Sequence, residues 1–249
     1  MNGQHTGSPV DGDDDLMRVG LLECDHVADR FLGIAGDYRD MFSRLLGAHG
    51  LEVVPVDVYR GELPISPRAF DGYVCTGSRH SAYDDLPWIH ELSRFIVDVA
   101  DAGVPFVGIC FGHQVLAHAL GGEVRRAGTG WGVGPHDTVI EQVEPWMEPP
   151  LARPRLQYMH QDQVVRVPDG ATVLGSADHC PIAMVRAGER MLGIQAHPEF
   201  PAAYVEALMS ARVDRIEADT LEVARRALTT STDDDAVAAW ITAFLRRTR

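Results

Sequence analysis

A cysteine stands at a predicted strand–helix junction in the middle of the chain, where Cys110 directly follows the apolar run Val104–Ile109. Gly108 and Gly112 lie two residues away on either side, and because glycine lacks a Cβ the chain can turn sharply there. This pattern is typical of a nucleophile elbow, in which the thiol is exposed above a sheet edge and the following helix N-terminus favours a thiolate and an oxyanion. The alternative is a buried structural cysteine, and the glycine spacing favours the nucleophile.

A thiol nucleophile needs a base, usually a histidine that a third group orients. The chain has 11 histidines, and His197 differs from the others because it follows a second apolar segment, Met191–Ala196. The carboxyl ends of parallel strands meet at one edge of a sheet, so Cys110 and His197 are expected to project from the same edge. Pro198 fixes the backbone between His197 and Glu199, which places the Glu199 carboxylate where it can orient the imidazole.

The elements that must position these groups alternate between strand and helix in the first half of the chain. This order predicts a mostly parallel central sheet flanked by helices, in an α/β fold. The expected strands are 18–22, 51–56, 72–75 and 104–109, and the expected helices follow Tyr38, Pro87 and Phe111.

The second half changes character, because its segments are short, β-like and separated by Gly, Pro and Asp. They predict antiparallel strands added to the main sheet, with the last one returning to it. These strands are expected at 123–126, 137–142, 155–158, 163–167, 171–175, 182–186 and 190–195. Two C-terminal helices are expected over 202–228 and 235–247. The predicted organisation is a disordered acidic tail (1–16), one domain (17–205) and a C-terminal helical extension packed on it (206–249).

Composition argues against several classes of protein. The 249 residues carry a formal net charge of -14, which disfavours nucleic acid as a partner. The sequence has no CxxC pair, no phosphate-binding GxxxxGK[ST] loop and no HExxH motif, so no cofactor and no metal are expected. It also lacks a signal-peptide pattern and an apolar run long enough to span a bilayer, which predicts a cytoplasmic protein without a membrane partner.

Two separated motifs resemble those of the class I (triad) glutamine amidotransferases. They are Gly-Ile-Cys-Phe-Gly-His-Gln at 108–114 and His-Pro-Glu-Phe at 197–200. Thr76-Gly77-Ser78 resembles the oxyanion-strand loop of the GMP-synthetase-like branch. The segment 158–164 resembles the loop that closes over bound glutamine, and its His-Gln-Asp-Gln form is similar to that of stand-alone members such as γ-glutamyl peptidases. The resemblance implies a flavodoxin-like amidotransferase domain over about residues 18–205.

The resemblance also implies a role for each matching residue. Cys110 would form a γ-glutamyl thioester, with His197 as acid and base and Glu199 orienting it. The backbone N–H groups of Gly77 and Phe111 would form the oxyanion hole. The remaining implied contacts, to the bound glutamyl group, come from Gln114, Met159, Gln161 and Asp162.

The predicted function is hydrolysis of the γ-amide of glutamine to glutamate and ammonia. A separate synthetase subunit that accepts the ammonia is a possible partner, since the chain contains no synthetase of its own. One alternative is a stand-alone hydrolase or peptidase acting on γ-glutamyl or glutathione-type compounds. A second alternative is a catalytically inactive binding module, which the intact Cys110, His197 and Glu199 disfavour.

Overall fold

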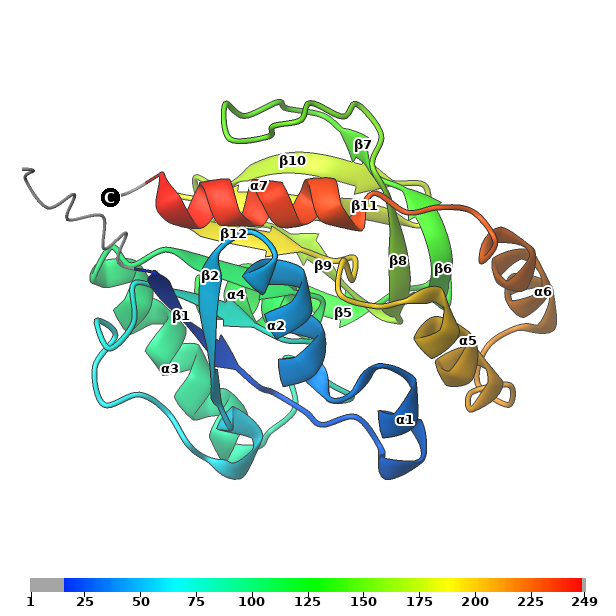
Figure 1. Ribbon diagram of the computed structural model, residues 1–249, viewed down its shortest axis with the longest axis horizontal. Coiled ribbons are helices and arrows are strands. Elements are labelled where there is room, and N and C mark those ends of the chain that lie inside the picture. Colours follow the sequence, from blue (N-terminus) through cyan, green and yellow to red (C-terminus); the bar gives the residue numbers. More distant parts are fainter. Residues whose placement is uncertain (1–15, 248–249) are drawn as a thin grey trace, which may run out of the picture.

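An eight-stranded sheet forms the centre of the computed structural model, which describes residues 16–247 (Figure 1). Its first five strands pair in parallel and its last three are antiparallel, which confirms the predicted α/β fold. The predicted acidic tail lies outside the described residues except for Leu16. In spatial order the strands are β2 (Leu51–Val56), β1 (Met17–Leu22), β3 (Gly72–Cys75), β4 (Phe106–Ile109), β12 (Met191–Ile194), β11 (Cys180–Ala187), β10 (Thr172–Ala177) and β7 (Val139–Ile140).

Two additional sheets of two strands each lie beside this sheet and pair antiparallel. One of their strands was not expected, because its sequence, Gly-Val-Gly-Pro-His-Asp, lacks both alternation and a continuous apolar run. The pairs are β5 (Glu123–Arg126) with β9 (Asp162–Arg166), and the unexpected β6 (Gly132–Asp137) with β8 (Arg155–His160).

Helices cover both faces of the main sheet (Figure 1). Side chains alternate along the central strand β4, so Val107 and Ile109 pack on the face that α2 and α7 cover. Phe106 packs on the opposite face, which α3 and α4 cover. None of the helices in residues 16–247 is long and apolar enough to cross a membrane. The helices are α1 (Leu32–Ala35), α2 (Tyr38–Gly47), α3 (Pro87–Asp101), α4 (Phe111–Ala119), α5 (Ala202–Ser210), α6 (Ala218–Ala227) and α7 (Asp234–Arg246), with 3₁₀ turns η1 (Asp29–Phe31) and η2 (Val58–Arg60).

The register of two neighbouring parallel strands determines which residues share an edge. β4 and β12 pair so that Ile109 lies opposite Ile194. The Cys110 N–H continues this pairing by donating a hydrogen bond of 2.8 Å to the Ile194 carbonyl. Cys110 and the segment after Ile194 therefore leave the sheet at the same level, as the sequence predicts.

The predicted helix over 202–228 is wrong in its length, because the chain breaks between α5 and α6. Ile216 is buried in this break, and α6 then packs on β6, where a Cβ on Gly134 would lie 3.0 Å from the Ala224 Cβ. Burial of these apolar groups requires a change of direction that helical periodicity alone does not signal. No Gly or Pro marks the break over 211–217.

Candidate active site

The junction between β4 and α4 holds Cys110 in a strained conformation. Its φ of 54° and ψ of −100° make it the one non-glycine residue between 16 and 247 with a positive φ. A Cβ on Gly108 would overlap the backbone of Gly112, and a Cβ on Gly112 would overlap the Cys75 carbonyl. Both glycines are therefore required by close backbone packing, and the thiol is carried on a tight turn above the sheet edge.

His197 lies three residues beyond the end of β12 and is held from three sides. Its Nδ1 lies 2.8 Å from Glu199 Oε1, and the two side chains are 3% and 0% exposed. The imidazole stacks on the Phe200 ring at a centroid distance of 3.9 Å. The His197 N–H donates to the Gln157 carbonyl at 2.8 Å. With Nδ1 engaged by the carboxylate, Nε2 is the nitrogen free to exchange a proton.

The protonation of His197 is governed by Cys110 and Glu199. Burial lowers the pKa of His197, whereas the charges of Cys110 and Glu199, and hydrogen bonds to both, raise it to about 10. The charges of Cys110 and Glu199 thus favour the imidazolium form of His197. A histidine beside a cysteine is the arrangement that activates a thiol as a nucleophile.

The predicted oxyanion-hole residues lie beside this pair. A Cβ on Gly77 would lie 3.0 Å from His197 Cε1 and 3.8 Å from the Cys110 Cβ. Phe111 is the first residue of α4 and directly follows the thiol. Neither the Gly77 nor the Phe111 N–H donates a hydrogen bond to another residue of the described chain, so both donors are available to a ligand.

Two cavities meet at Cys110, of about 240 Å³ and 130 Å³. Met159 lines both of them. His197 lines only the larger cavity, whereas Gln114 and Asp162 line only the smaller one. Among the predicted residues, His197 therefore lines the larger cavity alone, and Gln114, Gln161 and Asp162 line the smaller one alone.

The residues predicted to bind the glutamyl group make hydrogen bonds to one another and to neighbouring residues. Gln114 Nε2 donates to the Asp162 carbonyl at 2.8 Å and to Gln195 Oε1 at 3.1 Å, so this amide ties the start of β9 to the residue that follows β12. The segment predicted as a loop over bound glutamine is thus mostly strand, since only Gln161 lies between β8 and β9. The Asp162 carboxylate accepts hydrogen bonds from Ser81 and Tyr83. Gln161 Oε1 accepts a hydrogen bond of 2.7 Å from Arg126 at the surface.

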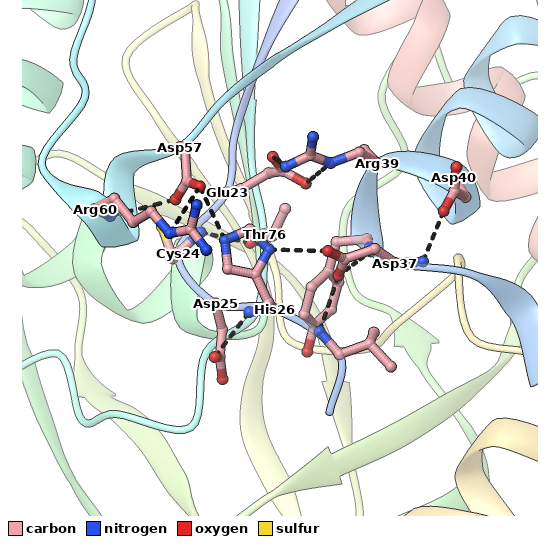
Figure 2. Close-up of polar contacts among 12 residues, drawn as sticks. Glu23, Cys24, Asp25, His26, Asp37, Arg39, Asp40, Asp57, Arg60 and Thr76 are labelled. Carbon is pink, nitrogen blue, oxygen red and sulfur yellow. Dashed lines mark hydrogen bonds and ion pairs between the residues drawn. The ribbon is translucent and has the colours of Figure 1, made fainter. Parts of the chain in front are cut away.

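The segment after β1 forms one wall of the larger cavity, and Figure 2 shows its ionic contacts. Glu23 is paired with Arg39, and the ring nitrogens of His26 lie 2.9 Å from Asp37 and 3.1 Å from Asp57. Partial burial lowers the pKa of His26, but these two carboxylates raise it overall. The donor atoms of Glu23, His26 and Asp37 lie close enough to hold a cation, yet each residue is already engaged in these contacts.

Three further residues of the larger cavity escaped the sequence analysis: Arg30, Arg212 and Arg215. Arg30 comes from η1, and the other two come from the turn between α5 and α6. None lies near a motif, and two of them reach the cavity only because the predicted helix 202–228 is broken. A pair of arginines three apart in a very acidic chain was the only available signal.

Comparison with known proteins gives consistent results. The sequence model for the family Glutamine amidotransferase class-I matches residues 43–203. The chain is 35% identical to Gamma-glutamyl peptidase 4 of Arabidopsis thaliana over 172 residues, covering 66% of this chain and 68% of that protein. It is 31% identical to a subunit of the glutamine-hydrolyzing GMP synthase of Sulfolobus acidocaldarius, covering 66% and 85%. A glutamine amidotransferase from Thermotoga maritima has a similar structure, with a TM-score of 0.73 at 22% identity over 94% of this chain and 97% of that one.

Proposed function

The chain belongs to the class I glutamine amidotransferase family, and from this premise we propose that it hydrolyses a γ-glutamyl amide bond through a thioester on Cys110. The observation that carries the proposal is the assembly of a strained cysteine at the edge of the sheet with a buried His197–Glu199 pair. Glutamine is the simplest substrate of this kind, and its products are glutamate and ammonia.

In the first half of the reaction, the Cys110 thiolate attacks the γ-carbonyl carbon and the carbonyl oxygen becomes an oxyanion. The backbone N–H groups of Gly77 and Phe111 donate to that oxyanion. The imidazolium of His197 gives its proton to the departing nitrogen as the carbon–nitrogen bond breaks. This leaves a γ-glutamyl thioester on Cys110 and a neutral imidazole.

In the second half, His197 takes a proton from a water molecule, which attacks the thioester carbon. The carbon–sulfur bond breaks, glutamate leaves and Cys110 returns as a thiolate beside the imidazolium. Glu199 holds the imidazole in one orientation throughout, because its hydrogen bond to Nδ1 keeps Nε2 directed at the reacting atoms. The smaller cavity, next to Gln114, Met159, Gln161 and Asp162, receives the α-amino and α-carboxylate end of the glutamyl group.

A second candidate is hydrolysis of γ-glutamyl peptides, in which an amino acid or peptide leaves in place of ammonia. It is favoured by the 35% identity to a γ-glutamyl peptidase and by the size of the cavity that His197 lines. The similarity to a GMP synthase subunit supports a different extension of the first candidate, in which a separate synthetase accepts the ammonia. Glutamate release that accelerates only when a synthetase is added would favour that extension.

The test measures glutamate release from glutamine, γ-glutamyl dipeptides and glutathione, together with the intact mass of acid-quenched protein. We expect one of these substrates to give turnover and a γ-glutamyl adduct on the protein. Cys110→Ala should lose both while its thermal unfolding stays cooperative. Unchanged turnover in Cys110→Ala would contradict the mechanism.

A further inference from the structure

Three arginines line the larger cavity without a carboxylate partner, and we name Arg30, Arg212 and Arg215 the arginine rim. Arg212 and Arg215 also line the smaller cavity, so the larger one is the cavity that all three share. None of them forms an ion pair within residues 16–247. The guanidinium groups of Arg212 and Arg215 lie 6.0 Å and 5.3 Å from the centre of the Trp131 ring. Arg30 lies 4.7 Å from the centre of the Phe31 ring. These cation–π contacts position the guanidinium groups, and their positive charges are left available to an anion.

The arginine rim is assembled from two segments that are far apart in the sequence. Figure 1 shows α1 and α5 at the same end of the molecule, and Phe31 contacts Tyr204 with ring centroids 6.3 Å apart. Arg30 precedes Phe31, and Arg212 and Arg215 follow α5. The Arg212 guanidinium donates to the Leu208 carbonyl at the end of that helix. The fold therefore brings the three charges to one cavity next to Cys110.

The acidic groups around the same cavity do not neutralise the arginine rim, because they have partners of their own. Asp25, which lines the cavity, accepts hydrogen bonds from Arg79, with the closest atoms 2.6 Å apart. The neighbouring carboxylates of Asp37 and Asp57 bind His26, as Figure 2 shows. In a chain with a formal net charge of -14, three arginines left unpaired around one cavity indicate a site for a negatively charged group.

The position of His197 places the departing half of the substrate in the cavity that all three arginines line. His197 must protonate the departing nitrogen, and it lines the larger cavity and not the smaller one. The departing group therefore lies in the larger cavity. A molecule the size of ammonia needs only about 10–15 Å³ of such space, whereas this cavity holds about 240 Å³.

We propose that the arginine rim binds a carboxylate on the leaving group, so that the enzyme selects γ-glutamyl amides of an amino acid or peptide over glutamine. The proposal rests on the proposed function, since it assigns the leaving side of the same reaction. The γ-carbonyl–nitrogen bond breaks, His197 supplies the proton, and the amino acid or peptide departs with its carboxylate against the rim. Water then releases glutamate from Cys110, so one water is consumed for each bond cleaved.

The test compares two substrates of nearly equal size. In γ-glutamylglycine the amide nitrogen carries CH₂–COO⁻, and in γ-glutamylethylamide it carries CH₂–CH₃. We expect wild type to show a kcat/KM at least about tenfold higher for γ-glutamylglycine, because one hydrogen bond between charged groups contributes about that much. Arg30→Gln and Arg215→Gln should each lower this ratio several-fold; both side chains are exposed, so the fold should be retained. Arg94→Gln, which removes the same charge from an exposed position of α3, should leave the ratio unchanged.

The possible failures are distinguishable. Absence of glutamate release from glutamine, γ-glutamylglycine and γ-glutamylethylamide alike would overturn both the proposed function and this inference. Equal kcat/KM for the last two substrates in wild type would overturn the inference alone. The same holds if the rim variants lower both substrates by the same factor, or if Arg94→Gln changes the ratio as much as they do.

Discussion

Strand pairing places Cys110 and His197 at one edge of the sheet, whereas the arginine rim comes from the ends of short helices. The first group depends on the register of β4 against β12 and on glycines whose Cβ atoms would overlap the chain. The second group comes from η1 and the α5–α6 turn, and all three of its members lie outside the residues 43–203 that match the family. The proposed function therefore assigns bond breaking to residues that the sheet places, and the further inference assigns the choice of leaving group to residues added around it.

After the loss of Cys110 itself, the largest effect is expected from removing the charge that orients His197. Glu199→Gln keeps an oxygen near Nδ1 but loses the negative charge that helps to raise the pKa of His197. We expect kcat for glutamate release to fall by roughly 10²–10⁴-fold, by analogy with triads that lose their acidic member. Glu91→Gln, at an exposed position of α3, is the control. A fall of less than threefold would mean that Phe200 stacking alone orients the imidazole.

The next largest effect tests the backbone directly. Gly112→Ala places a Cβ against the Cys75 carbonyl, and because backbone cannot move as a side chain can, we expect the free energy of unfolding to fall by about 3–5 kcal/mol. Gly128→Ala is a matched control, since a Cβ at that position meets nothing within 4 Å. Denaturant unfolding measures both. Equal stability of the two variants would show that the junction tolerates a side chain.

The placement of Cys110 and His197 at one edge of the sheet was predictable because its determinants are local in the sequence. Gly108 and Gly112 mark the turn, two apolar runs mark the strands, and parallel pairing brings their ends together. Each of these signals is read within a few residues of Cys110 or His197. The strand at Gly132–Asp137 was missed for the converse reason, since its sequence carries no local strand signal.

The arginine rim was not predictable, because it depends on where a helix ends for reasons of packing. The periodicity of 202–228 predicts one helix, and in that helix Arg212 and Arg215 would continue along the axis of α5. Burial of Ile216 and the approach of Ala224 to β6 turn the chain instead. Arg30 lies about 180 positions earlier, so only tertiary structure brings the three together.

A smaller effect follows from the charges beside His197. Burial lowers the pKa of His197, but the charges of Cys110 and Glu199 raise it overall, from an ordinary value of 6.5 to about 10. Its contribution to stability is therefore fully present below pH 6.5 and is lost as pH rises through about 10. We expect the wild-type Tm to fall more steeply between pH 7 and pH 10 than that of Glu199→Gln, which lacks one of these charges. Parallel Tm profiles would show that Glu199 does not raise the pKa of His197.

The smallest effect is expected at Gln161, and it tests whether this side chain contacts the glutamyl group. The family resemblance assigns Gln161 to glutamyl binding, but its side-chain oxygen accepts a hydrogen bond from Arg126 at the surface. Gln161→Ala should therefore change kcat/KM for any cleaved substrate by less than about threefold, as surface substitutions usually do. Asp162→Asn is the contrasting variant, because Ser81 and Tyr83 bind that carboxylate. A loss of more than tenfold in Gln161→Ala would show that a side chain determines specificity on the glutamyl side as well. The contrast between Cys110 and His197, which strand register places, and the arginine rim, which selects the substrate through side chains, would then no longer separate chemistry from specificity.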